Sequence, residues 1–323
     1  MRITGTILIA WRGENLSVEQ REWIQQRAPE ARILVTQDRD EIEAERDRIE
    51  IANEGVPREW LAHMPRLKWY AQYGAGVDWL LRHPDVRDAD FLLTNGSGIH
   101  AVPISEHIIG MMLALSRQLP KALRQQMQGQ WDRSIAETTF ELAAKTMVLV
   151  GVGAIGERTA RLASALGMRV IGVRRNAERG AEGVERMVAP QDLQQVLPEA
   201  DVLVLTIPLT PETRHMIGAA ELSLLKPSAY LINIGRGGTV DQDAMIEALR
   251  QGRLAGAGLD VFEQEPLPSD SPLWDMQNVL ITPHVSGFTP ARAERAWALF
   301  SDNLERYLSD RPLCNLVDKQ LGY

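Results

Sequence analysis

The chain has 323 residues, of which 45% are hydrophobic and 24% are charged. This composition is ordinary for a globular protein of two domains, and the formal net charge of −8 argues against a nucleic-acid partner. No apolar run approaches the roughly 20 residues that a membrane span needs, so no membrane partner is expected. Cys314 is the only cysteine, which excludes an intrachain disulfide and fits a cytoplasmic location.

The first third of the chain predicts a parallel sheet. Short apolar runs alternate there with polar or helical segments, which is typical of strands joined by crossover helices. The expected strands cover residues 6–10, 32–36, 48–52, 67–72 and 91–94.

A long apolar helix is expected next, over residues 103–119. Pro103 suits its first turn, and Pro120 would end it. Apolar side chains cover most of its circumference, which indicates burial between domains, against a second subunit, or both. Met111 and Met112 are expected to serve packing rather than cofactor binding.

From residue 145 onward the pattern predicts a nucleotide-binding unit. Six strands are expected, the count of a complete dinucleotide fold, over residues 146–150, 169–173, 201–206, 229–233, 256–260 and 279–282. The helix over 292–308 and the tail that follows it have no strand left to pair with. We therefore expect them to return to the first domain, which would comprise residues 1–100 plus 289–323 and leave 101–288 as the second domain.

Three glycines mark the turn after the first strand of this unit. Gly151, Gly153 and Gly156 form the G-x-G-x-x-G pattern between an apolar strand and a helix. The first allows a tight turn, the second lets a pyrophosphate approach the backbone, and the third lets helix and strand pack closely. The amides of Ala154 and Ile155 are then predicted to face the pyrophosphate. The alternative is a glycine-rich turn with no ligand.

The end of the next strand indicates which dinucleotide binds. An acidic residue there would hydrogen-bond the ribose 2′-hydroxyl of NAD, but this chain has Arg174, Arg175 and Asn176. Guanidinium groups pair with a 2′-phosphate, so the pattern favours NADP. A solvated basic turn, with NAD bound through other groups, is the alternative.

Four further segments resemble those of the D-isomer-specific 2-hydroxyacid dehydrogenases. The similarity extends over nearly the whole chain, and its main motifs are Gly-Ala-Gly-Val-Asp at 74–78, Asn-Ile-Gly-Arg-Gly at 233–237, Leu-Asp-Val-Phe-Glu-Gln-Glu-Pro at 259–266, and Thr-Pro-His at 282–284. The resemblance implies an α/β fold with two doubly wound parallel sheets: a Rossmann dinucleotide-binding domain and a smaller flavodoxin-like substrate domain. It also implies a homodimer, because relatives commonly pair through the region of the long apolar helix.

The chemistry of keto-acid reduction explains three of these residues. Arg236 can supply the cation that a carboxylate and a ketone oxygen need, and His284 can supply the proton, because imidazole titrates near neutral pH. Glu265 would hydrogen-bond the other ring nitrogen and favour the imidazolium form. The non-catalytic alternatives are that Arg236 is a surface arginine, His284 a structural histidine and Glu265 a loop carboxylate.

The remaining site residues follow from the resemblance. Asp260 would meet the nicotinamide end of the cofactor, and the backbone N–H groups of Ala75 and Gly76 would bind the substrate carboxylate. Further cofactor contacts are expected at Ile207, Pro208, Thr213, Ile234, Gly235, Arg236, His284 and Gly287. His100 replaces an asparagine common in the family, and its role stays open.

The sequence therefore predicts an NADP(H)-dependent oxidoreductase that interconverts a small 2-keto acid and a D-2-hydroxy acid, with glyoxylate and hydroxypyruvate as first candidates. The histidines lack metal-ligand spacing, so no catalytic metal is expected. One alternative is an NAD-linked enzyme like phosphoglycerate dehydrogenase. Another is a non-catalytic regulatory protein that senses the nucleotide, which the intact Arg236, Glu265 and His284 disfavour.

Overall fold

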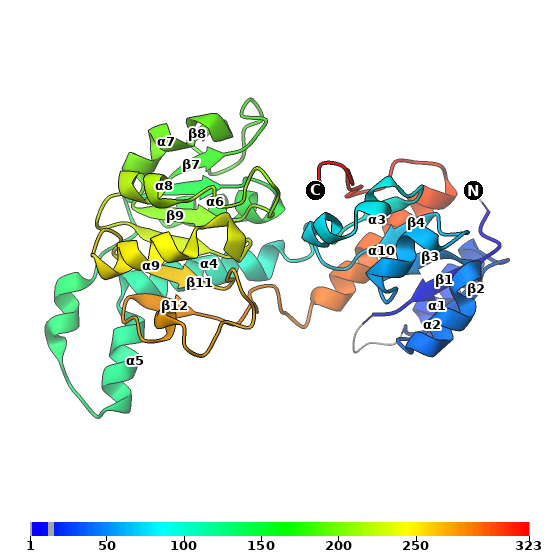
Figure 1. Cartoon of the computed structure of the whole chain (residues 1–323), viewed down its shortest axis with the longest axis horizontal. Helices are drawn as coiled ribbons and strands as arrows, with labels where there is room; N and C mark the ends of the chain where they lie inside the picture. The colour runs from blue at the N-terminus through cyan, green and yellow to red at the C-terminus, as the bar shows by residue number, and fades with distance from the viewer. Residues whose placement is uncertain (1, 12–15, 323) are drawn as a thin grey trace. The chain divides into compact units, whose positions relative to one another are not determined.

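The computed structural model describes residues 2–11 and 16–322, which form two compact units. Unit 1 comprises Met1–His100 and Thr289–Tyr323, and unit 2 comprises Ala101–Phe288. Each unit is an α/β body built on one parallel sheet, and most of the strands are labelled in Figure 1. The predicted fold class is confirmed.

The sheet of unit 1 has the strand order β2-β1-β3-β4-β5, and every pair is parallel. This is the flavodoxin order, as expected. Its strands are β1 (Thr6–Ile9), β2 (Arg32–Val35), β3 (Ile49–Asn53), β4 (Trp69–Ala71) and β5 (Leu92–Thr94). Its helices are α1 (Val18–Arg27), α2 (Arg39–Glu45), α3 (Pro84–Asp88) and α10 (Arg292–Leu308), with short 3₁₀ turns at Arg46–Arg48, Arg58–His63 and Asp78–Arg82.

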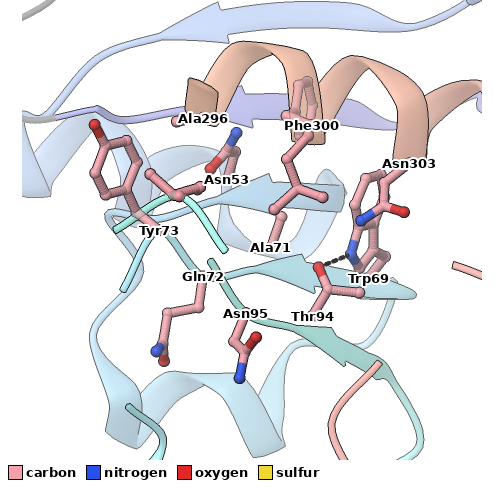
Figure 2. A pocket seen from close by; sticks show the side chains of 12 residues that line it. Asn53, Trp69, Ala71, Gln72, Tyr73, Thr94, Asn95, Ala296, Phe300 and Asn303 are labelled. Carbon is pink, nitrogen blue, oxygen red and sulfur yellow. Dashed lines mark hydrogen bonds between the residues drawn. The ribbon is translucent and has the colours of Figure 1, made fainter. Parts of the chain in front are cut away.

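Helix α10 belongs to unit 1 because its apolar face packs on β4. The ring of Trp69 on β4 stacks on Phe300 and Tyr307 at centroid distances of 5.5 and 5.8 Å. Beside this stack, β4, β5 and α10 line a cavity of about 20 Å³, shown in Figure 2. Beyond the helix, Leu316 forms an antiparallel bridge with Thr94 at the end of β5. Burial of these aromatic side chains explains why the last part of the chain returns to the first sheet.

The sheet of unit 2 has the order β12-β11-β10-β9-β6-β7-β8, again all parallel. The chain order reverses between β6 and β9, where doubly wound sheets bind nucleotides. The strands are β6 (Thr146–Val150), β7 (Arg169–Val173), β8 (Arg186–Val188), β9 (Val202–Leu205), β10 (Tyr230–Asn233), β11 (Gly256–Leu259) and β12 (Val279–Ile281). The helices are α4 (Ala101–Ser116), α5 (Leu119–Met127), α6 (Ala154–Ala165), α7 (Leu193–Val196), α8 (Ala219–Leu224) and α9 (Gln242–Arg250), with 3₁₀ turns at Arg133–Thr138, Pro190–Asp192, Leu197–Glu199, Gly237–Thr239 and Pro272–Trp274.

Two sequence-based expectations about unit 2 were wrong. The sheet has seven strands rather than six, because the three-residue edge strand β8 is too short and too exposed to give an apolar pattern. The apolar helix ends at Ser116 rather than at Pro120. Gln118 turns the chain with a φ of 56°, and Pro120 lies in the first turn of the next helix, α5.

Helix α4 packs against α6, β10 and β11 within unit 2. Met111 and Met112 belong to the core that these elements share, so they are packing residues. Leu113 is partly exposed on the opposite side. Within the described ranges, no helix is both long and apolar enough to cross a membrane.

Candidate active site

The three glycines after β6 occupy three different environments. Gly151 has a φ of +101°, and a Cβ there would lie 2.8 Å from both Thr206 Oγ1 and Ile207 Cγ2. A Cβ on Gly156 would lie 2.1 Å from the Gly151 carbonyl oxygen, so α6 could not pack against the turn. At Gly153, by contrast, a Cβ would meet no described atom within 4 Å. The turn is therefore tight where the fold needs it and open at the N-terminus of α6, which fits a pyrophosphate.

The basic turn after β7 faces a carboxylate on the first turn of α6. Glu157 Oε1 lies 3.5 Å from Arg174 Nη1 and 3.5 Å from Arg179 Nη2. Arg174 Nη1 is buried and makes no hydrogen bond to the described part of the chain, although its charge is partly compensated by Glu157. Burial lowers the pKa of the neighbouring Arg175 guanidinium, and the Glu212 carboxylate opposes that effect. This is a cationic cluster in which Arg174 Nη1 has donor capacity left for an anion.

The loop after β9 meets the glycine turn and the loop after β10. The Thr206 hydroxyl donates to the Gly151 carbonyl at 2.5 Å, and a Cβ on Gly235 would lie 2.6 Å from the Ile207 carbonyl oxygen. Thr213, expected to contact the cofactor, uses its hydroxyl within its own turn, donating to Pro208 O and accepting from Thr210 N, each at 2.7 Å. Its observed contacts shape the turn.

His284 and Glu265 form a close pair beyond β12 and β11. His284 Nδ1 lies 2.7 Å from Glu265 Oε2, and Glu265 Oε1 accepts the Phe262 backbone N–H at 3.0 Å. Because a carboxylate only accepts hydrogen bonds, Nδ1 carries the hydrogen and Nε2 is left for another partner. The His284 side chain is 49% exposed, so that nitrogen can be reached from outside.

Asp260 holds the loop that carries His284. Its side chain is fully buried, and it accepts hydrogen bonds from the Thr282 hydroxyl at 2.5 Å, Val285 N at 2.9 Å and Ser286 N at 3.0 Å. The resemblance implied a contact between Asp260 and the nicotinamide, whereas the contacts observed here are with this loop. His107, on α4, adds a 3.0 Å contact between its Nε2 and Thr282 Oγ1. Sequence analysis assigned His107 no role.

Arg236 follows β10 on a tightly held turn. Its carbonyl oxygen accepts from Asn233 Nδ2 at 3.0 Å and from the Thr239 hydroxyl at 2.7 Å. A Cβ on Gly237 would lie 1.8 Å from the Phe262 carbonyl carbon, so this glycine lets the loops after β10 and β11 approach each other. The loops after β10, β11 and β12 bring Arg236, Glu265 and His284 to the carboxyl edge of one sheet, with Ile234 and Gly287 in the first and last of these loops.

The predicted substrate loop lies in unit 1, after β4. The carbonyl groups of Gly74, Ala75 and Gly76 all accept hydrogen bonds from side-chain amides. The ring of His100 lies 6.3 Å from the ring of Tyr73, at an interplanar angle of 58°. Across the described ranges, no three His, Cys, Asp or Glu side chains are grouped as a metal site would require.

A doubly wound sheet with a glycine turn and an Arg, Glu and His set at its carboxyl edge defines a nucleotide-dependent oxidoreductase. Residues 109–286 match the family model of the NAD-binding domain of D-isomer-specific 2-hydroxyacid dehydrogenases. The chain belongs to this family, as the sequence resemblance predicted.

Similarity to individual relatives and to one solved structure supports the same family. The chain is 34% identical over 311 residues to glyoxylate reductase of Thermococcus litoralis, covering 93% of this chain and 90% of the relative. It is also 34% identical over 271 residues to D-3-phosphoglycerate dehydrogenase of Methanocaldococcus jannaschii, covering 81% of this chain but only half the length of that relative. The NADPH-dependent glyoxylate/hydroxypyruvate reductase from Sinorhizobium meliloti, solved with NADP and sulfate, superposes with a TM-score of 0.82 at 30% identity, covering 99% of this chain and all of the other.

Proposed function

We propose that this protein uses NADPH to reduce a small 2-keto acid to the D-2-hydroxy acid, and catalyses the reverse reaction with NADP. The observation that carries the proposal is the His284–Glu265 pair, 2.7 Å apart, at the same sheet edge as Arg236 and the open glycine turn. In this assignment residues 101–288 bind the dinucleotide, and residues 1–100 with 289–323 supply the substrate loop.

The residues divide the work of the reaction. NADPH, when bound, supplies the hydride that attacks the keto carbon. Arg236 orients the substrate carboxylate and polarises the carbonyl, because its guanidinium forms charge-assisted hydrogen bonds with both oxygens. His284 gives the proton on Nε2 to the carbonyl oxygen as negative charge develops there. Glu265 holds the ring orientation through Nδ1 and stabilises the charged imidazolium.

We propose that the protein prefers NADP to NAD because of the basic turn after β7. Arg174 offers a buried Nη1 without a hydrogen bond in the described structure, and Arg175 and Asn176 follow it. A 2′-phosphate has the charge and the acceptor oxygens to use these donors. The glycine turn accounts for the pyrophosphate, with Ala154 and Ile155 as the amides that face it.

Glyoxylate and hydroxypyruvate are the substrates we propose, since relatives named for these reductions cover nearly the whole chain. The test is a turnover panel of small 2-keto acids with NADPH and with NADH, followed by chiral analysis of the product. Formation of the D-2-hydroxy acid with NADPH supports the proposal. Absence of turnover with every keto acid, despite NADPH binding, would favour the nucleotide-sensing alternative.

A second candidate is phosphoglycerate dehydrogenase activity, suggested by the relative of that name. The chain spans half of that relative's length, and the basic turn at Arg174 disfavours NAD. Oxidation of 3-phosphoglycerate with NAD, faster than any keto-acid reduction with NADPH, would select this candidate.

We also propose a cytoplasmic location, which a single cysteine suits.

We further propose a homodimer that pairs through the α5 segment. Figure 1 shows α5 and the chain after it projecting away from the sheet of unit 2. This segment exposes Leu123, Met127 and Trp131, the last with 94% of its surface open. Large apolar side chains exposed together on one projecting segment favour an interaction surface.

A further inference from the structure

The loop after β4 has its carbonyl groups anchored from inside unit 1. Gln72 Nε2 donates to Gly74 O at 2.8 Å and to Gly76 O at 2.6 Å. Asn95 Nδ2 donates to Ala75 O at 2.9 Å. Three successive peptide oxygens are thus held by two side-chain amides.

Both amides are themselves fixed. Gln72 is 6% exposed, and its Oε1 accepts the Trp79 indole N–H at 2.6 Å, so both ends of the amide are used. Asn95 Oδ1 accepts from Ser97 N at 3.0 Å. These partners determine which atom of each amide is nitrogen and which is oxygen.

Strand pairing places the two amides side by side. Ala71 of β4 is in register with Thr94 of β5, so Gln72 and Asn95 follow at the same sheet edge. Figure 2 shows both side chains pointing away from α10 and Phe300. The Gly96 N–H also donates to Gly74 O at 3.0 Å, which joins the two loops directly.

A second set of contacts supports Gln72 and the start of the loop. Glu54 Oε1 accepts the Tyr73 N–H at 2.5 Å, and Glu54 Oε2 lies 3.8 Å from Arg58 Nη2. The Arg58 guanidinium lies over the Trp79 ring, 4.3 Å from its centroid. The indole that binds Gln72 is therefore held from its face as well as through its N–H.

Because the peptide unit is planar and trans, anchoring its C=O group also fixes the direction of its N–H group. In each trans peptide unit the N–H points opposite to the C=O. Holding the oxygens of Gly74 and Ala75 inward therefore turns the N–H groups of Ala75 and Gly76 outward, and the third anchor at Gly76 O fixes the far end of the loop next to the buried Val77. No described residue accepts a hydrogen bond from these two groups, and successive outward N–H groups form an anion-binding nest.

We propose that Gln72 and Asn95 are positioning residues that preorganise this nest, formed by the N–H groups of Ala75 and Gly76, for the substrate carboxylate. The proposal rests on the proposed function, which assigns the loop to the substrate. It predicts that the two amides govern carboxylate affinity without taking part in hydride or proton transfer.

The test compares Gln72→Met and Asn95→Ala with the wild-type protein. Each variant removes amide donors and adds no charge. Methionine nearly keeps the volume of Gln72, and the smaller change at Asn95 frees one carbonyl only. A charge-assisted hydrogen bond to a carboxylate is worth about 1.5–3 kcal/mol, or roughly 10- to 100-fold in affinity. We therefore expect KM for glyoxylate and Kd for the non-reducible analogue oxamate to rise about 10- to 100-fold, with NADPH affinity unchanged and a smaller change in kcat.

Asn303 provides a matched control. It is also a buried amide of unit 1, and it bonds two backbone atoms, Cys314 O and Cys314 N, rather than the carbonyl groups of the substrate loop. Asn303→Leu should lower thermal stability while leaving KM and oxamate affinity at wild-type values. If Gln72→Met fails to fold, Asn95→Ala carries the test alone.

Three outcomes separate the proposals. Wild-type values of KM and of oxamate affinity in a folded Gln72→Met or Asn95→Ala variant overturn the positioning role. Oxamate binding that depends on both amides, in a protein that reduces no keto acid, supports the nest and rejects the proposed reaction. A wild-type protein that neither binds oxamate nor turns over glyoxylate rejects both.

Discussion

Replacing Glu157 with Gln should strengthen NADPH binding and leave NADH binding unchanged. Glu157 Oε1 lies 3.5 Å from Arg174 Nη1, so it partly neutralises a cation proposed to bind the 2′-phosphate, and it lies 3.5 Å from Nη2 of the nearby Arg179. The carboxylate would also repel that phosphate. NADH lacks the phosphate, and its affinity should not respond to this charge.

The magnitude follows from distance and exposure. Two unit charges 3.5 Å apart interact by about 5 kcal/mol at an effective dielectric constant of about 20. Glu157 and Arg179 are 36% and 66% exposed, and measured energies of such surface pairs are only about 0.2–1 kcal/mol. Arg174 is 16% exposed, so its pair with Glu157 belongs near the top of that range. Relief of both pairs should tighten NADPH by about 1–2 kcal/mol, or roughly 5- to 30-fold.

The assay is the dissociation constant of NADPH and of NADH at two salt concentrations, for wild type, Glu157→Gln and Arg174→Ala. Arg174→Ala is the opposing control and should weaken NADPH roughly 10- to 100-fold, because it removes charge-assisted donors. Both effects should shrink at high salt, which screens exposed charges. Equal changes for NADPH and NADH, or none for NADPH in either variant, would refute the assignment of the 2′-phosphate to this turn.

Three further predictions concern the reaction and the assembly. His284→Ala should lower kcat for glyoxylate about 10²- to 10⁴-fold with NADPH affinity retained, measured by steady-state kinetics and titration, and a wild-type rate with rate-limiting chemistry would contradict its role as the acid. Glu265→Gln keeps a hydrogen-bonding group at His284 Nδ1 but replaces the charge-assisted hydrogen bond with a weaker neutral one, so kcat for glyoxylate should fall with NADPH affinity retained; a wild-type kcat would argue against the pair. The double variant Met127→Ser, Trp131→Ser should be a 36.1 kDa monomer, whereas the wild-type protein should be a dimer, as measured by light scattering. A wild-type protein that is itself monomeric would contradict the proposed dimer.

Much of the fold could be predicted because strand ends and glycines leave local signals. The apolar runs at β6 and β7 are buried almost throughout, and the glycine turn joins β6 to α6 as its spacing requires. Strand β8 left no such signal, since its three residues lie at the sheet edge and are largely unburied. The end of α4 was misplaced because Gln118, a residue that rarely signals a break, takes the left-handed conformation that ends it.

The site was only partly accessible to sequence reasoning. Glu265 and His284, paired in the prediction, do lie in contact, because the motifs that contain them follow adjacent strands. The contacts of Asp260 with Val285 and Ser286 span more than 20 residues and depend on how β11 and β12 pair. The part played by Glu157 beside Arg174 depends in the same way on the docking of α6 next to β7.

The backbone at His284 shows why the hydrogen bonds of Asp260 matter for the proposed chemistry. His284 has a φ of 54°, a conformation uncommon for residues other than glycine, and it persists only where the surroundings fix it. Asp260 supplies that constraint by accepting hydrogen bonds from the Thr282 hydroxyl before the histidine and from two N–H groups after it. Because the Asp260 carboxylate is fully buried, its charge is offset by these donors rather than by water. The imidazole is therefore held at both ends, by its own backbone through Asp260 and by Nδ1 through Glu265, so only Nε2 remains to meet a substrate.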